Sequence, residues 1–189
     1  MMKGNEAKKI FSEDDELYQY GMNLLIDELA NISVAVVLGV LSGRWLEIVF
    51  FVLSFVSLRR YAGGYHCKTS KGCFWMSSLI MAVAVAGIVL LQTLTSRIPG
   101  VLPWICLWES VMGICILMLV PIEAKNKPLD SIEKKVYGKR ARITMIIQMA
   151  AAFLLLVPQT RFGAVLIVTH SIILITLLIA KCLQHIHKA

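Results

Sequence analysis

The sequence predicts an all-α integral membrane protein with about six hydrophobic helical segments and both termini in the cytoplasm. Of the 189 residues, 58% are hydrophobic and the mean hydropathy is +0.73, whereas a soluble domain is typically about 45–50% apolar. Most Lys and Arg residues lie between apolar runs rather than within them, which is typical of membrane topology. We therefore interpret residues 1–189 as a single membrane-embedded domain with no removable signal peptide.

The expected elements follow the apolar runs in order. After a charged segment over residues 1–20, the runs cover residues 21–43, 45–58, 74–95, 101–122, 143–158 and 162–183. The first run is interrupted by Asp27, Glu28 and Asn31, and the second has only fourteen residues. A full span needs about 20 residues, and runs of about 10–14 are often re-entrant or interfacial. We expect the last four runs to cross the membrane, and we leave open whether the first two cross it or dip into it.

The distribution of cations predicts which side each connection faces. With both termini inside, all but three of the nineteen Lys and Arg residues lie on the cytoplasmic side, and the three outside are Arg44, Arg97 and Arg161. Cytoplasmic connections carry such an excess of Lys and Arg. The connections over residues 59–73 and 123–142 are therefore expected in the cytoplasm. The net charge of +7 is explained by topology, so it gives no reason to expect a nucleic-acid partner.

The polar connection over residues 59–73 contains the candidate catalytic groups His66 and Cys73. A thiol attacks as the thiolate, which a neighbouring imidazole and positive charge favour. On a straight helix, positions seven apart lie roughly 10 Å apart, too far for a hydrogen bond of about 3 Å. A dyad of His66 and Cys73 therefore requires the chain to fold back, which Gly63 and Gly64 permit.

Cys73 is also expected at or next to the start of a helix, because Phe74 begins the third apolar run. Free backbone N–H groups and the positive end of the helix dipole would favour a thiolate there, and the same N–H groups could bind an oxyanion. The alternative is a turn in which Cys73 is an inert small residue. Local chemistry alone does not decide between these two interpretations.

Two blocks of sequence resemble the accessory gene regulator B (AgrB) family. The first consists of Arg59, the pair Gly63-Gly64, His66 and Cys73, followed at once by an apolar run. The second covers residues 121–129, with a Pro followed by Lys-Asn-Lys-Pro. Members of this family are membrane cysteine endopeptidases that process the precursors of Gram-positive autoinducing peptides used in quorum sensing.

The resemblance implies a mechanism and roles for these residues. Cys73, activated by His66, would cleave the C-terminal part from a short precursor peptide through an acyl-enzyme thioester. A thiol of the peptide would then take over the acyl group and close a thiolactone ring. Arg59 and Gly64 would support the site. The alternative function is a small non-enzymatic transporter or signalling component, in which the polar connection serves topology only.

Substrate binding is expected on the cytoplasmic cations. The segment 123–142 carries seven cations, and by the resemblance Lys125 and Lys127 would bind an acidic C-terminal segment of the precursor. The alternative is that this charge only sets topology and attracts anionic membrane lipid. Asp27 and Glu28 would lie near the cytoplasmic face, where they could pair with Arg59 or contact the substrate. A homodimer is left open.

No metal or cofactor is expected. The five cysteines form no CxxC pair, and His66, Cys67 and Cys73 lack the fourth ligand that a structural zinc site normally has. Polar residues within apolar runs usually face protein or water. For His170, in the last run, we expect a satisfied interhelical hydrogen bond rather than a catalytic role.

Overall fold

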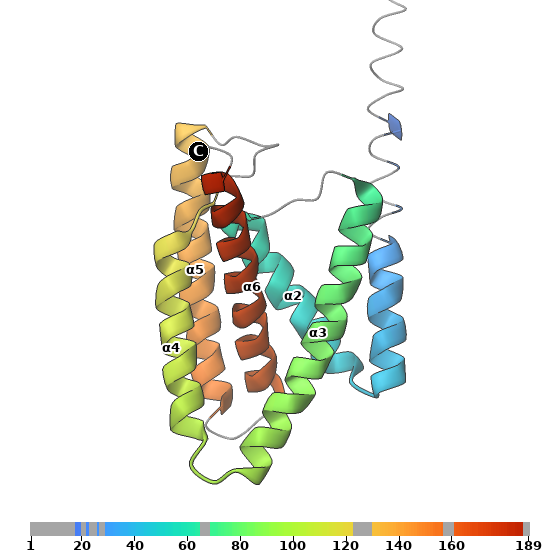
Figure 1. Cartoon of the computed structure of the whole chain (residues 1–189), viewed down its shortest axis with the longest axis vertical. Helices are drawn as coiled ribbons and strands as arrows, with labels where there is room; N and C mark the ends of the chain where they lie inside the picture. The colour runs from blue at the N-terminus through green and yellow to red at the C-terminus, as the bar shows by residue number, and fades with distance from the viewer. Residues whose placement is uncertain are drawn as a thin grey trace, which may run out of the picture.

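The computed structural model describes residues 18–19, 22, 26, 29–64, 69–122, 130–156 and 161–186. In this part of the chain the regular elements are helices, which confirms the all-α prediction. A short apolar helix, Leu29–Ser42, precedes α2 (Trp45–Ala62), α3 (Ser70–Arg97), α4 (Leu102–Leu119), α5 (Ser131–Leu156) and α6 (Arg161–Ile186) (Figure 1). Three stretches are long and apolar enough to cross a membrane: Lys71–Arg97, Leu102–Leu119 and Arg161–His185.

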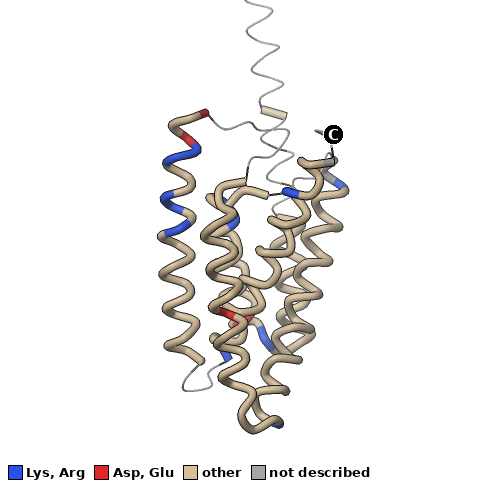
Figure 2. Tube along the Cα trace, turned by 60° about the vertical axis from the view of Figure 1, so that its left-hand side comes forward, with Lys and Arg blue, Asp and Glu red and all other residues tan. Residues whose placement is uncertain are grey.

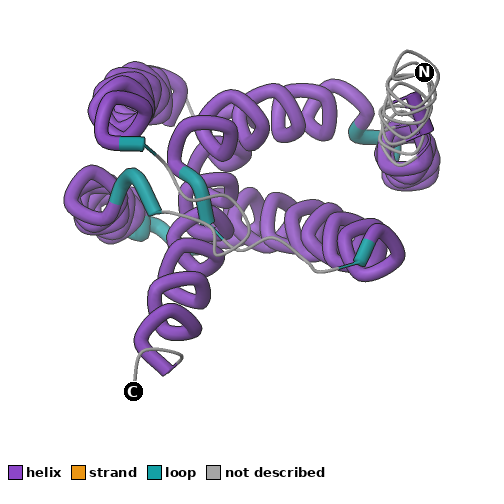
Figure 3. Tube along the Cα trace, turned by 90° about the horizontal axis from the view of Figure 1, so that it is seen from above, coloured by secondary structure: helices purple, strands orange, loops and turns teal. Residues whose placement is uncertain are grey.

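Helix α6 lies at the centre of the bundle. It packs against α2, α3, α4 and α5. Of its most apolar stretch 61% is buried inside the protein, against 17% for α3. The helix Leu29–Ser42, by contrast, lies at the edge of the bundle when the molecule is viewed from above (Figure 3). The exposed apolar side chains of the outer helices, such as Trp75, Leu79 and Leu154, are compatible with a lipid environment.

Helix α5 differs from the sequence-based prediction, because residues 131–142 form its first half rather than a basic loop. Side chains cap the start of this helix: Asp130 Oδ1 accepts from the Ser131 N–H at 2.6 Å, and Glu133 Oε2 accepts from the Asp130 N–H at 3.2 Å, which is half of a capping box. These bonds satisfy donors that a helix start leaves unpaired. Lys, Arg and Glu are also good helix formers. The prediction of a loop was therefore wrong for residues 131–142, whose high charge is compatible with a helix.

Helix α2 also extends further than the fourteen-residue run predicted from apolar composition. It continues to Ala62 and has Arg59 and Arg60 in its last turn. Cations stabilise the C-terminal end of a helix through its dipole. Because α3 already begins at Ser70, the connection between the two helices covers residues 63–69 rather than 59–73.

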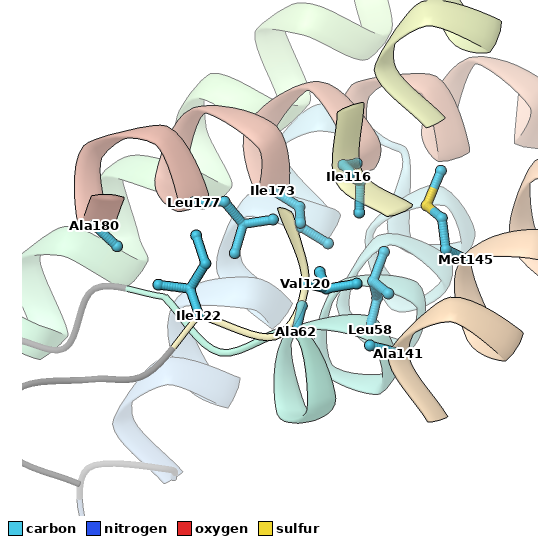
Figure 4. Packing of buried hydrophobic residues seen from close by; sticks show 10 residues of the cluster. All are labelled: Leu58, Ala62, Ile116, Val120, Ile122, Ala141, Met145, Ile173, Leu177 and Ala180. Atoms are coloured by element: carbon cyan, nitrogen blue, oxygen red, sulfur yellow. The ribbon is translucent and has the colours of Figure 1, made fainter. Parts of the chain in front are cut away.

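One cluster of buried hydrophobic residues joins the ends of four helices beneath this connection. It consists of Leu58, Ala62, Ile116, Val120, Ile122, Ala141, Met145, Ile173, Leu177 and Ala180 (Figure 4). These residues come from α2, α4, α5, α6 and the segment after α4. Alanines let helix backbones approach closely, and close packing is a main source of helix association in lipid. The end of α2 is therefore fixed against the rest of the bundle.

Candidate functional site

Cys73 lies in the first turn of α3, as predicted, and its side chain is exposed. Thr69 is the N-cap residue: its side-chain oxygen accepts from the Gly72 N–H at 3.2 Å. Its carbonyl oxygen accepts from the Cys73 N–H at 3.0 Å. These two N–H groups are therefore already bonded and are not among the free N–H groups that were expected at the helix start. The positive end of the helix dipole remains next to the thiol.

The predicted dyad lies only partly within the described residues, which include Cys73. His66 and its neighbours Tyr65, Cys67 and Lys68 lie outside them. Lys125, Lys127, Asp27 and Glu28, the expected substrate-binding residues, lie outside them as well. The pairing of His66 with Cys73 and the roles of these four residues thus stay predictions.

Arg59 and Gly64 contact each other at the end of α2. The Arg59 guanidinium donates through Nη1 to the Gly63 carbonyl oxygen, so it folds under the turn that follows its own helix. Gly64 is buried and has a φ of 120°. A Cβ atom at this position would overlap the Arg59 guanidinium. A glycine is therefore favoured here by the backbone angle, and a side chain at this position would also displace the Arg59 guanidinium.

The turn after α2 pairs with the segment after α4. Gly63 forms a parallel β-bridge with Ile122, and the Ile122 N–H donates to the Ala62 carbonyl at 3.0 Å. A Cβ atom at Gly63 would overlap the Ile122 carbonyl oxygen. The two blocks of sequence singled out above, about sixty residues apart, thus meet through their backbones.

Helix α5 hydrogen-bonds to the end of α4 and packs against the segment that follows it. Arg142 donates through Nε to the Leu117 carbonyl and through Nη2 to the Val120 carbonyl, both at 3.3 Å. These carbonyls are at the C-terminal end of α4, where a helix leaves acceptors unpaired. A Cβ atom at Gly138 would lie only 3.0 Å from Pro121 Cδ, so the lack of a side chain at Gly138 lets Pro121 approach α5 closely.

Aromatic and cationic side chains connect the exposed halves of α2 and α5. The rings of Tyr61 and Tyr137 lie 6.2 Å apart, and the Arg140 guanidinium lies 5.6 Å from the Tyr61 ring centroid. Contacts of a guanidinium with an aromatic face at this distance are attractive. The first half of α5 carries a series of cations with two acidic residues at its start (Figure 2). Lys134, Lys135, Lys139 and Arg140 are all exposed.

Cys73 and the Arg59–Gly64 turn lie at the same end of the molecule but on separate helix ends. Helices α2 and α3 diverge toward this end, and residues 63–69 connect them (Figures 1 and 3). The described residues thus bring Arg59, Gly63 and Ile122 together and place Cys73 apart from them. In the sequence, residues 65–68, which include His66, separate them.

His170 makes the interhelical hydrogen bonds that were expected of it. Its Nδ1 lies 2.6 Å from Glu109 Oε1, and its Nε2 lies 3.1 Å from Gln148 Oε1. His170 and Glu109 are both fully buried. The sequence marked all three residues as polar positions in apolar runs, but it gave no signal that they are partners.

The fold and the site together define a helical membrane protein. It has an exposed thiol in the first turn of one helix, and a glycine turn at the end of the preceding helix accepts a hydrogen bond from an arginine. Over residues 2–185 the chain matches the family model of accessory gene regulator B. The chain therefore belongs to the accessory gene regulator B (AgrB) family, as the two blocks of sequence predicted.

Two curated relatives from Clostridium perfringens agree with this assignment. The chain is 27% identical over 136 residues to an AgrB-like protein of strain SM101 / Type A, and the alignment covers 71% of this chain and 63% of the relative. It is 26% identical over 136 residues, with the same coverage, to AgrB-like protein 2 of strain 13 / Type A. The matched region thus spans less than two thirds of the relatives' own length. No solved structure matches the chain.

Proposed function

We propose that this protein is a membrane cysteine endopeptidase that cleaves a short autoinducing-peptide precursor and promotes its cyclisation. The observation that carries the proposal is the exposed thiol of Cys73 in the first turn of α3, in a chain that belongs to the AgrB family. An exposed thiol beside the positive end of a helix dipole suits a nucleophile better than a packing residue.

In the proposed reaction His66 accepts the proton of the Cys73 thiol, and Sγ attacks a backbone carbonyl carbon of the precursor. The tetrahedral intermediate collapses when the C–N bond breaks, and the leaving amine takes the proton back from His66. The C-terminal part of the peptide departs, and its N-terminal part stays bound to Cys73 as a thioester.

A second step releases the peptide without water. A thiol of the bound peptide attacks the thioester carbonyl, a new thioester closes the ring, and the Cys73 thiol forms again. One thioester replaces another, so little bond energy is lost as long as water is excluded. A site at the membrane surface, between helix ends and lipid, supports such exclusion.

The proposed substrate binds partly through charge, on the cytoplasmic side of the cell membrane. The exposed cations on the first half of α5 and the Lys125–Lys127 pair would attract an acidic C-terminal segment of the precursor. Electrostatic attraction of this kind raises the rate of encounter and weakens as salt screens exposed charges.

Replacement of the two proposed catalytic residues tests the function. We expect Cys73→Ala and His66→Ala each to abolish cleavage of the precursor in nanodiscs, while membrane insertion and thermal stability stay unchanged. Cys67→Ser is the matched control, because Cys67 adjoins His66 but does not lie on α3, and it should remain active. A non-enzymatic transporter or signalling component would leave the peptide uncleaved by every variant and by the wild type.

A further inference from the structure

A chain of hydrogen bonds crosses the buried interior of the bundle and ends on α2. It begins at Glu109 on α4, passes through His170 on α6 with a 2.6 Å contact, and reaches Gln148 on α5 with a 3.1 Å contact. The Gln148 amide nitrogen then donates to the Ser54 carbonyl at 3.0 Å and to Ser57 Oγ at 2.9 Å, both on α2. Four helices are thus joined by one polar chain.

The directions of the bonds made by Gln148 follow from the last member of the chain. The Ser54 carbonyl can only accept, so the Gln148 side chain must turn its NH₂ group toward α2. Its amide oxygen then faces His170, and His170 Nε2 must carry a proton and donate it. This orientation results from the chemistry of the partners and does not depend on which amide atom is assigned as nitrogen.

The contact between His170 and Glu109 must therefore contain one more proton. At 2.6 Å, Nδ1 and Oε1 are within hydrogen-bond distance, and two lone pairs facing each other there would repel. The shared proton can lie on either atom: an imidazolium–carboxylate pair and an imidazole–carboxylic acid pair contain the same number of protons. In both forms the pair is neutral overall, which limits the cost of burying it among lipid-embedded helices.

The burial of this pair excludes contact with a peptide. Both side chains are fully buried, and Glu109 Oε2 is buried with no hydrogen-bond partner among the described residues. The hydrogen-bonded route from this pair to α2 runs through Gln148. The connection is short, because Ser57 is next to Leu58 and two residues from Arg59. Leu58 belongs to the buried cluster beneath the turn after α2.

We propose that Glu109 and His170 hold one proton between them and that this proton, acting through Gln148, fixes the end of α2 that carries Arg59 and the Gly63–Gly64 turn. The three residues are positioning residues. Their effect on catalysis rests on the peptidase function proposed above, whereas the shared proton and the position of α2 do not.

The proton arrangement is tested in the full-length wild-type chain. The chain contains four histidines, so nitrogen NMR of protein labelled with ¹⁵N-histidine in nanodiscs resolves a small set of signals, and His170→Gln assigns the signal of His170. We expect a protonated Nε2 and a strongly deshielded proton near Nδ1 that disappears in Glu109→Leu. An unprotonated Nε2 at His170, or a deshielded proton that persists in Glu109→Leu, would overturn the proposal.

The positioning effect is tested by hydrogen exchange at the end of α2. Gln148→Leu removes the link to Ser54 and Ser57, and its matched control is Ile147→Leu, an exposed neighbour on the same helix. We expect amides in residues 58–64 to exchange roughly tenfold faster in Gln148→Leu, which corresponds to about 1.4 kcal/mol of opening free energy. They should exchange at the wild-type rate in Ile147→Leu. Equal exchange in the two variants would contradict the proposal.

A pair of substitutions at Glu109 keeps the test decisive even where Gln148→Leu does not fold. Glu109→Gln retains a donor toward His170 Nδ1, whereas Glu109→Leu does not, so only the leucine variant should show fast exchange over residues 58–64. Where the precursor is cleaved, the leucine variant should lose kcat several-fold with KM unchanged. Identical behaviour of the two Glu109 variants would refute the positioning role. A wild-type chain that cleaves no peptide would contradict the peptidase function alone, since exchange and NMR are read without substrate.

Discussion

Substitution of Gly63 by alanine should separate the two paired backbone segments at the candidate site. The new Cβ would overlap the Ile122 carbonyl oxygen, so the turn after α2 must move away from the segment after α4. This movement breaks the 3.0 Å hydrogen bond from the Ile122 N–H to the Ala62 carbonyl. It also displaces the Gly63 carbonyl to which Arg59 donates.

The expected cost can be estimated from these interactions. Gly63 has a φ of 77° and a ψ of −151°, a combination almost restricted to glycine that costs an alanine about 1–3 kcal/mol. Loss of a neutral backbone hydrogen bond adds about 1 kcal/mol, and loss of one from a charged donor adds about 1.5–3 kcal/mol. The displacement of the turn thus contributes about 2.5–4 kcal/mol beyond the backbone strain alone.

Gly100 provides the matched control for this prediction. It has a φ of 80°, almost that of Gly63, but no atom lies within 4 Å of a Cβ built on it. Gly100→Ala should therefore show the strain of a positive φ without the loss of contacts. We expect the midpoint of thermal unfolding in nanodiscs to be lower in Gly63→Ala than in Gly100→Ala by on the order of 5–15 °C.

Cleavage of the precursor should also be impaired more in Gly63→Ala than in Gly100→Ala. We expect kcat/KM in Gly63→Ala to be at least about tenfold below that of Gly100→Ala, since 1.4 kcal/mol is a factor of ten. A Gly63→Ala protein that is as stable and as active as Gly100→Ala would show that pairing with Ile122 does not organise the site.

Three further results are expected. Arg59→Lys should lower kcat/KM by roughly 10–100-fold, because lysine keeps the charge but lacks the guanidinium group that binds the Gly63 carbonyl. Full activity would show that Arg59 contributes only a positive charge that sets membrane topology. Joint replacement of Lys125 and Lys127 by Gln should raise KM more than it lowers kcat and should weaken the salt dependence of cleavage. An unaltered KM and salt dependence in a correctly inserted protein would show that these two lysines do not bind the substrate. Iodoacetamide should modify Cys73 faster than Cys67 near neutral pH, measured by peptide mapping; equal rates would argue against a reactive thiolate at the start of α3.

The sequence allowed the fold class and the position of Cys73 to be predicted because both depend on local patterns. Apolar runs mark helices in lipid, and the change from polar to apolar residues at Phe74 lies within the first turns of α3, which begins at Ser70. The hydrogen bonds of His170 could be expected for a similar reason, since a polar side chain inside an apolar run needs a partner.

The contacts that shape the site could not be predicted in the same way. The pairing of Gly63 with Ile122 joins backbone groups about sixty residues apart in sequence, and backbone groups are the same in every residue. Free N–H groups were expected at the start of α3, but Thr69 accepts from those of Gly72 and Cys73. The start of α5 did have a sequence signal, because an Asp followed three residues later by a Glu is typical of a helix N-terminus, and Glu133 accepts from the Asp130 N–H. The high charge of the segment obscured that signal.

The most direct test of the peptidase function is a search for the acyl-enzyme. Wild-type protein in nanodiscs is mixed with the precursor, quenched in acid within seconds, and analysed by intact-protein and peptide mass spectrometry. We expect an adduct with the mass of the N-terminal part of the precursor, attached to Cys73, removed by hydroxylamine as a thioester should be, and missing in Cys73→Ala. Cleaved peptide produced by Cys73→Ala, or an adduct on another cysteine in the wild type, would contradict the assignment of Cys73 as the nucleophile.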